Sequence, residues 1–275
     1  MAHSHPPFRQ NQAKSATCLL PRTAHWGSGF CALALLVACS GRVEEQAFTE
    51  DIYIAVASNF SQAATSLART FEAESGRTVV LSFGSSGKLC SQIQNGAPFD
   101  IFLAADVVRP QLLEEGGFAI AGSRFTYAVG RLVLWSPQSD LIDPNGLVLH
   151  ASQFEHLALA NPDIAPYGMA ARDVLQNLQL WDDLAERLVL GQNIAQALQF
   201  VDSGNAELGF IAFSQWSDEK RQTAGSHWVV PQSLHAPILQ QAIACTEKDG
   251  AAEFLSYLQG PNGLGVIHSF GYEAP

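Results

Sequence analysis

The chain has 275 residues, 47% of them hydrophobic, and a formal net charge of −11. This length and apolar content are enough for one large or two modest hydrophobic cores. The acidic balance disfavours nucleic acid and anionic membrane surfaces as partners, because like charges repel. Any anion that binds must therefore be held by local dipoles against an unfavourable overall field.

The first 38 residues have the composition of an export signal. They contain basic residues but no acidic one, so the rest of the chain carries 12 basic against 26 acidic side chains, a net charge of −14. An apolar run at 30–38 follows the basic part. It is too short to span a bilayer but suits the hydrophobic region of a signal peptide. We therefore predict that residues 1–38 are a signal peptide that is removed on export.

The end of this apolar run, Leu36-Val37-Ala38-Cys39, resembles a bacterial lipobox, in which the cysteine becomes the first mature residue and carries a lipid. We expect lipid attachment at Cys39, with plain cleavage nearby as the alternative. Residues 39–48 are charged and without a periodic pattern, which predicts a tether. No later segment has the length and apolarity of a membrane span. The expected location is the periplasm, with membrane contact only through a lipid.

Two neighbouring segments share one pattern: an apolar run that predicts a strand, a turn with hydroxyl groups, and then apolar residues at helical spacing. The first consists of a run at 52–56, the turn Ala57-Ser58-Asn59 and a helical pattern from Phe60 to Phe71. The second consists of a run at 78–81, the turn Phe83-Gly84-Ser85-Ser86-Gly87 and a shorter helix.

Each of these predicted helices begins just after a serine. A helix start offers unpaired N–H groups and the positive end of the helix dipole. Two such starts can hold a small anion without any lysine or arginine. The alternative is that Ser58, Asn59 and Ser86 are ordinary capping residues, which is the commoner role of these residue types.

The alternation of strands and helices continues to about residue 124 and predicts an α/β fold with a mostly parallel sheet. A long extended run at 125–135 then suggests a crossing into a second lobe. We place lobe I at 49–125 plus 237–275 and lobe II at 126–236. Further strands are expected at 157–160, 188–190, 208–213, 228–230 and 238–244, and the final helices at 249–259 and 261–269.

The second lobe offers two more helix starts after short turns, at Tyr167-Gly168 and Asn193-Ile194. Ligands of open α/β sheets bind at the carboxyl ends of the strands, where these turns are expected. Helix starts in both lobes therefore predict a ligand cleft between them.

Residues 52–272 resemble the molybdate-binding proteins of bacterial ABC importers over nearly the whole mature chain, in the expected order. The matching motifs are short, but the ordered set is specific: Ala57-Ser58-Asn59, residues 83–87, residues 96–106, Asn161-Pro162, Pro166-Tyr167-Gly168, residues 258–261 and residues 270–272. The resemblance implies a two-lobed periplasmic binding protein in which each lobe is a mostly parallel sheet flanked by helices.

Carried over by position, the resemblance implies that Ser58, Asn59 and Ser86 bind the anion from lobe I. From lobe II, Tyr167 and Ile194 would contribute backbone N–H groups. The chain departs from the family where many members have a tyrosine on the strand near 208–213, because Ala212 stands there. The phenol of Tyr167 is a candidate replacement for that hydroxyl.

The resemblance further implies that the protein captures molybdate, and also tungstate, and delivers it to an ABC permease after hinge closure. The site would be built only of hydrogen-bond donors, so it would disfavour protonated anions such as hydrogen phosphate. No catalytic residue, cofactor or metal ion is expected, and molybdenum would bind only as its oxyanion. The protein is expected to be a monomer. A binding protein for sulfate, thiosulfate or another oxyanion is the alternative.

A more remote alternative is a serine acyl-enzyme, because Ser85-Ser86-Gly87-Lys88 matches S-x-x-K. The companion motifs of those enzymes have only poor counterparts here. An effector-binding domain of a transcription regulator shares this fold, but the predicted signal argues against it. The histidines show no metal-ligand spacing. Whether Cys90 and Cys245 form a disulfide in the exported protein is left open.

Overall fold

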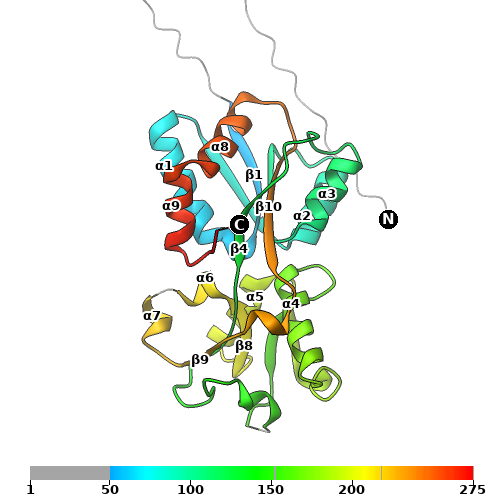
Figure 1. The fold of residues 1–275 in the computed structure, drawn as a ribbon, viewed down its shortest axis with the longest axis vertical. Helices are drawn as coiled ribbons and strands as arrows, with labels where there is room; N and C mark the ends of the chain where they lie inside the picture. Colours follow the sequence, from blue (N-terminus) through cyan, green and yellow to red (C-terminus); the bar gives the residue numbers. More distant parts are fainter. Residues whose placement is uncertain (1–49, 152, 218, 275) are drawn as a thin grey trace, which may run out of the picture. The chain divides into compact units, whose positions relative to one another are not determined.

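The structure is a computed structural model and describes residues 50–151, 153–217 and 219–274. The predicted signal peptide at 1–38, the tether at 39–48 and Cys39 lie outside these residues. The unit from Ala47 onwards has two lobes, each built on one five-stranded sheet (Figure 1). The predicted two-lobed α/β fold is therefore confirmed.

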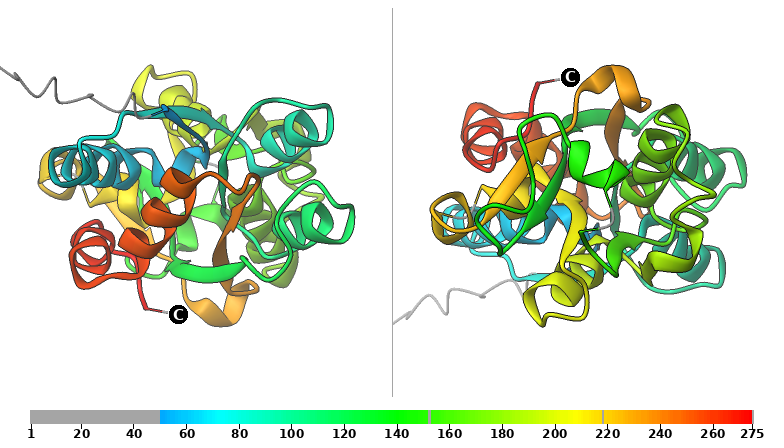
Figure 2. Two further views of the ribbon diagram at one scale, coloured as in Figure 1. Left: turned by 90° about the horizontal axis from the view of Figure 1, so that it is seen from above. Right: turned by 90° about the horizontal axis from the view of Figure 1, so that it is seen from below.

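The first lobe has the strand order β2-β1-β3-β10-β4, in which β1, β2 and β3 are parallel and β10 is antiparallel to both of its neighbours. Its strands are β1 (Ile52–Ala57), β2 (Val79–Gly84), β3 (Ile101–Ala104), β4 (Phe125–Gly130) and β10 (Ile238–Ala244). Its helices lie on both faces of the sheet (Figures 1 and 2). They are α1 (Ser61–Ser75), α8 (Asp249–Gln259) and α9 (Pro261–Ser269) on one face, and α2 (Ser86–Gln94) and α3 (Val108–Glu115) on the other.

The second lobe has the strand order β7-β6-β8-β5-β9. Strand β6 is parallel to β7 and β8, whereas β5 is antiparallel to β8 and β9. Its strands are β5 (Leu132–Ser136), β6 (Leu157–Ala160), β7 (Leu188–Gly191), β8 (Leu208–Ala212) and β9 (Ser226–Val229). Its helices are α4 (Pro166–Asn177), α5 (Ile194–Asp202), α6 (Phe213–Trp216) and α7 (Glu219–Gln222).

Helix α1 shows why the apolar spacing was informative. Its buried residues are Ala63, Ala64, Leu67, Ala68 and Phe71, all within the helical pattern predicted from Phe60 to Phe71. The helix ends at Gly76, whose φ of 71° is the left-handed conformation that glycine adopts most readily. One continuous apolar stripe thus packs α1 on the sheet of the first lobe.

The lobe boundary differs from the prediction. Strand β4 was assigned to lobe II, but it pairs with β10 in the first sheet, and only β5 belongs to the second. The chain therefore crosses at Arg131 rather than after residue 125. The apolar run at 125–135 could not reveal this, because its pattern is the same on both sides of the crossing. The chain returns between the end of β9 at Val229 and the start of β10 at Ile238.

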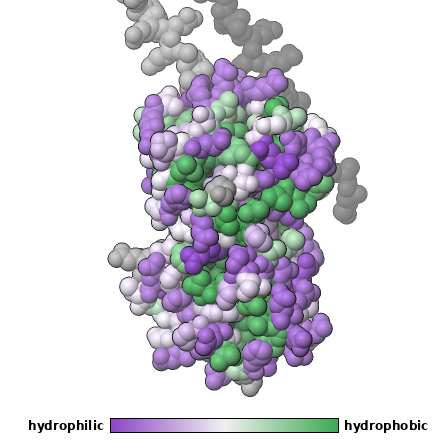
Figure 3. All heavy atoms as spheres, viewed as in Figure 1, coloured by the Kyte–Doolittle hydropathy of each residue, from purple (hydrophilic) through white to green (hydrophobic). Residues whose placement is uncertain are grey.

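Small corrections apply to two other elements. Phe213 begins the short helix α6 instead of ending the preceding strand. Helix α3 begins at Val108, ahead of Pro110, and the carboxylate of Asp106 accepts the N–H of Arg109 at 2.8 Å near its start. Within the described ranges, no helix has the length and apolarity needed to cross a membrane. The face drawn in Figure 3 is largely polar, with hydrophobic residues in separate groups on both lobes.

Candidate functional site

Helix starts from both lobes meet at one small cavity. Its lining comprises Ala57, Ser58, Asn59, Gly84, Ser85, Ser86, Ala105, Ala165, Pro166, Tyr167, Asn193 and Ile194. All five residues predicted to bind the ligand are among them. The space is small, with a volume of about 10 Å³ for a water-sized sphere.

In the first lobe, the chain enters the cavity directly from two parallel strands. Ser58 and Asn59 form a 3-10 turn between β1 and α1, and both are buried. Ser85 caps α2, since its hydroxyl accepts the N–H of Lys88 at 3.4 Å. Ser86 is the first residue of that helix and is fully buried.

The hydroxyl of Ser86 is oriented by the strand next to it. Its Oγ accepts the backbone N–H of Ala105 at 2.9 Å. A serine hydroxyl has one proton to donate, and this contact does not use it. The proton is therefore available to an acceptor in the cavity.

In the second lobe, α4 and α5 begin at the cavity wall. Pro166 opens α4 and places Tyr167 in its first turn. The side chain of Asn193 caps α5 by accepting the N–H of Gln196 at 3.0 Å. Ile194, the first residue of α5, is buried, as is Tyr167.

Buried N–H groups at this cavity lack partners. Across the described ranges, no hydrogen bond is donated by the backbone N–H of Ser86, Tyr167 or Ile194. Leaving a buried N–H unpaired costs about 1–3 kcal/mol, so such groups normally face a ligand or water. The lining includes no charged side chain. The cavity is therefore an array of neutral donors at the positive ends of helices, which suits an anion and not a cation.

Tyr167 has its two ends in different surroundings. Its N–H is at the start of α4, whereas its phenol oxygen accepts a hydrogen bond from Nε2 of Gln240 at 3.4 Å. A Cβ atom on Gly130 would collide with this phenol oxygen. Burial raises the pKa of the Tyr167 phenol well above its usual range, so the hydroxyl stays protonated. Ala212, the residue at the position of the family tyrosine, is fully buried.

The residues that hold Asn59 in place were not predicted from the sequence. The Asn59 amide nitrogen donates to Oε1 of Gln240 at 2.9 Å and to the Tyr272 hydroxyl at 3.1 Å. Its carbonyl accepts from the hydroxyls of Tyr272 at 2.8 Å and Ser214 at 3.0 Å. Gln240 also accepts from the Tyr127 hydroxyl at 3.1 Å. The one sequence feature that could have indicated this network is a glutamine, Gln240, inside the largely apolar run 238–244.

The two lobes contact each other on both sides of the cavity. On one side, the N–H of Gly87 donates to the carbonyl of Ile164 at 3.0 Å, and Arg109 reaches the carbonyl of Asp163 at 3.5 Å. On the other side, Ser214 of lobe II donates to the Asn59 carbonyl. The structure is thus a closed form, with the donors of both lobes facing one space.

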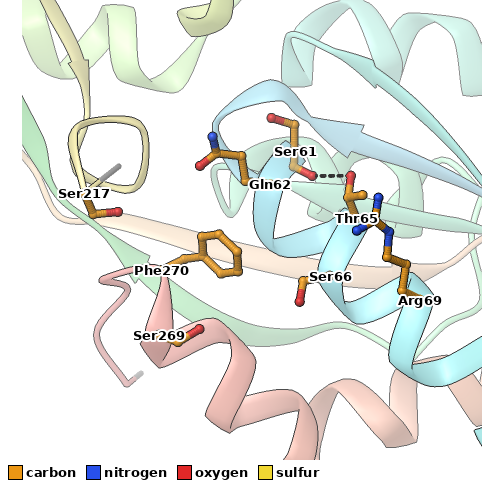
Figure 4. A pocket seen from close by; sticks show the side chains of 8 residues that line it. All are labelled: Ser61, Gln62, Thr65, Ser66, Arg69, Ser217, Ser269 and Phe270. Carbon is orange, nitrogen blue, oxygen red and sulfur yellow. Dashed lines mark hydrogen bonds between the residues drawn. The ribbon is translucent and has the colours of Figure 1, made fainter. Parts of the chain in front are cut away.

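A second groove is larger, with a volume of about 610 Å³, but its chemistry is different. Figure 4 shows side chains from α1, including Arg69, facing Ser217 and the end of α9 at Ser269 and Phe270. Arg69 is exposed, so water already solvates this cation. The unpaired backbone N–H groups of Ser86, Tyr167 and Ile194 face the smaller cavity, which we take as the candidate site despite its size.

The structure gives no support to the alternative chemistries. Ser85 is engaged in capping α2, and Lys88 is exposed. Among the described residues, no cluster of three or more histidine, cysteine or acidic side chains could hold a metal ion. Cys90 and Cys245 pack in the same apolar cluster, and both are free thiols.

A two-lobed α/β fold with a cavity between the lobes is typical of solute-binding proteins. The model of the family described as bacterial extracellular solute-binding protein matches residues 52–273. The chain belongs to this family, and within it to the branch of the molybdate-binding proteins. Its members are exported components of transport systems rather than enzymes, and their location is the periplasm.

Individual relatives carry this assignment. The molybdate-binding protein ModA of Azotobacter vinelandii is 48% identical over 240 residues, which cover 86% of this chain and 93% of the relative. ModA of Rhodobacter capsulatus is 40% identical over 92% of this chain and 97% of the relative. A solved structure of the Azotobacter vinelandii periplasmic molybdate-binding protein superimposes with a TM-score of 0.79, at 42% identity, over 82% of this chain and 99% of that one.

Proposed function

We propose that this protein captures molybdate in the periplasm and delivers it to the permease of an ABC importer. The observation that carries the proposal is the set of buried, unpaired N–H groups around a cavity without charged side chains. The similarity to two molybdate-binding proteins supports the choice of anion. Tungstate, which is nearly the same size, should bind similarly.

Six donors are available to the ion: the N–H groups of Asn59, Ser86, Tyr167 and Ile194 and the hydroxyls of Ser58 and Ser86. A hydrogen bond to a charged acceptor contributes roughly 1.5–3 kcal/mol, so this set can support tight binding despite the desolvation of the ion. A site of donors alone disfavours an anion that carries a proton, because that proton finds no acceptor. Hydrogen phosphate should therefore bind weakly.

The proposed mechanism is hinge closure. Asn59 and Ser86 belong to one lobe, whereas Tyr167 and Ile194 belong to the other, so one anion can bridge both. The bridging ion stabilises the closed form, in which Gly87 contacts Ile164. Closure makes liganded and ligand-free proteins different in shape, which is the property a permease needs to distinguish them.

Thermal unfolding of residues 40–275 with molybdate, tungstate, sulfate, phosphate or no anion tests the ligand. A ligand at about 100 times its Kd adds roughly 2.7 kcal/mol of stability. We expect stabilisation by molybdate and tungstate. Stabilisation by sulfate alone would favour the alternative, a sulfate or thiosulfate carrier. No stabilisation by any oxyanion would reject the proposal.

We further propose that Cys39 carries a lipid, that residues 39–48 tether the binding unit, and that the protein is a monomer. The motif Leu36-Val37-Ala38-Cys39 supports the first point. Replacing Cys39 by alanine should release the protein into the soluble periplasmic fraction, and mass spectrometry of the wild-type N-terminus should detect the lipid. Light scattering of residues 40–275 should give the mass of one chain.

A further inference from the structure

A buried polar network lies between the two halves of the candidate site and centres on Gln240. Its Oε1 accepts from Asn59 of lobe I at 2.9 Å, and its Nε2 donates to the phenol of Tyr167 of lobe II at 3.4 Å. The side chain of Gln240 is fully buried. Both neighbours are residues whose N–H groups face the cavity in the proposed function.

The backbone of β10 explains how this side chain reaches the site. The register of β10 against β4 shifts between Gln240 and Gln241. A bulge of this kind re-aims side chains and is common next to functional sites. Gln241 contacts Arg124 at 2.9 Å and Thr126 at 3.2 Å, both within the first lobe. The two adjacent glutamines thus contact different residues, and of the two only Gln240 contacts residues of the site.

The polar atoms of Gln240 leave little freedom to its amide. Its oxygen accepts from two donors, Asn59 and the Tyr127 hydroxyl, while its nitrogen donates to Tyr167. If the amide were reversed, its nitrogen would face the amide nitrogen of Asn59, and two donors would meet. A glutamine with both ends engaged fixes the separation of its neighbours, which matters because a site functions only when supporting contacts hold its donors in place.

The side-chain amide nitrogen and the backbone carbonyl of Asn59 both have partners within the protein. Its amide nitrogen donates to Gln240 and Tyr272, and its carbonyl accepts from Tyr272 and Ser214. These contacts occupy the amide nitrogen and the carbonyl of this residue. Among the backbone groups of Asn59, the N–H is the one left for the cavity.

We propose that Gln240 is a positioning residue for anion capture: its side chain links Asn59 of lobe I to Tyr167 of lobe II. It thereby aims N–H groups of both lobes at one ion. This inference rests on the proposed function, because it assigns Gln240 to that same site. Gln240 itself is not among the residues that line the cavity.

The test compares Gln240→Met with Gln241→Met in residues 40–275. Methionine keeps the length of the side chain and removes its hydrogen bonds, and both variants lose contacts on the same strand. Calorimetric titration with molybdate gives Kd, and stopped-flow fluorescence separates association from dissociation. We expect Gln240→Met to raise Kd at least about tenfold, mainly through faster dissociation, and Gln241→Met to leave Kd within about threefold.

A second variant keeps the test decisive if Gln240→Met does not fold. Tyr167→Phe removes only the phenol hydroxyl, which accepts from Gln240, and keeps the N–H of Tyr167. It should raise Kd by a few-fold. A wild-type Kd for Tyr167→Phe would overturn the inference and leave the proposed function standing. Failure of the wild type to bind molybdate overturns the proposed function and the inference with it.

Discussion

Gly87 of lobe I donates its backbone N–H to the carbonyl of Ile164 of lobe II at 3.0 Å. A Cβ atom at Gly87 would lie 2.8 Å from that oxygen and 3.1 Å from the Cα of Ile164. Both are backbone atoms, so the contact cannot be relieved by rotating a side chain. The closed form therefore requires a residue without a side chain at this position.

Gly87→Ala should consequently weaken molybdate binding without unfolding the protein. Alanine is tolerated in a helix, so the ligand-free stability should be retained. We expect Kd to rise by roughly 10- to 100-fold, equivalent to about 1.4–2.8 kcal/mol. Small-angle scattering with saturating molybdate should show a more open shape than the wild type. Gly265→Ala, where an added Cβ meets nothing within 4 Å, is the matched control. Equal Kd values in both variants would refute the role of this contact.

Ser86→Ala should reduce affinity for a different reason. It removes the hydroxyl proton that the Ala105 contact leaves free for the ion. A hydrogen bond to a charged acceptor is worth roughly 1.5–3 kcal/mol, so Kd should rise about 10- to 150-fold. The ligand-free protein should also lose about 1 kcal/mol of stability, because Ala105 loses its acceptor. Calorimetry on Ser91→Ala, an exposed serine of the same helix, should give the wild-type Kd; a wild-type Kd for Ser86→Ala would exclude its hydroxyl from the site.

Asp100 is predicted to matter for stability and not for binding. Its buried carboxylate accepts from the N–H of Tyr53 at 2.9 Å and the hydroxyl of Thr246 at 2.9 Å, and it pairs with Lys248 at 3.2 Å. Asp100→Ala leaves these groups without their acceptor, which should cost about 3–5 kcal/mol. Denaturant unfolding should show this loss, while molybdate Kd stays near that of the wild type. A stable variant with impaired binding would reverse the assignment.

The two thiols of the mature chain should be unreactive while the protein is folded. Burial raises the pKa of Cys245 to about 12, and it also raises the pKa of Cys90. At pH 8 both groups are therefore protonated, and the thiolate that reacts with a disulfide reagent is scarce. We expect no fast reaction of native residues 40–275 and two reactive thiols after unfolding. Finding none after unfolding would indicate a disulfide instead.

The same raised pKa values determine the dependence of stability on pH. A thiol with a higher pKa in the folded state binds its proton more tightly there. Its contribution is fully present below the unfolded pKa near 9 and is lost as the pH rises towards about 12. Stability should therefore fall with pH in this range, and less so in Cys245→Ala. An equal fall in that variant would contradict the assignment.

Local sequence patterns predicted those helices and strands that are marked by their own residues, such as an apolar run or a proline at a helix start. The bounds of β6, β10, α8 and α9 agree with the ranges expected from the sequence. Pro261 at the start of α9 and the apolar run of β10 are examples of such signals. The resemblance to molybdate-binding proteins named five candidate residues, and the structure places all five at one cavity. Their role in binding stays a prediction.

Contacts between distant segments could not be predicted in this way. The assignment of β4 to the first sheet depends on its pairing with β10, which is more than 100 residues away in the chain. Gln240 and Asn59 are separated by 181 residues. A glutamine in an apolar strand indicates a buried polar contact but does not identify its partner. The positioning network beneath the site was therefore visible only in the fold.

The binding of molybdate between the lobes can be observed in a crystal of residues 40–275 grown with molybdate, with data collected at the molybdenum absorption edge. Anomalous scattering locates the ion independently of any assumption about the site. We expect one molybdenum peak in the cavity between the lobes, within hydrogen-bonding reach of Ser58, Ser86, Tyr167 and Ile194 and without a charged side chain in contact. A peak in the groove beside Arg69, with none in the cavity, would contradict this expectation.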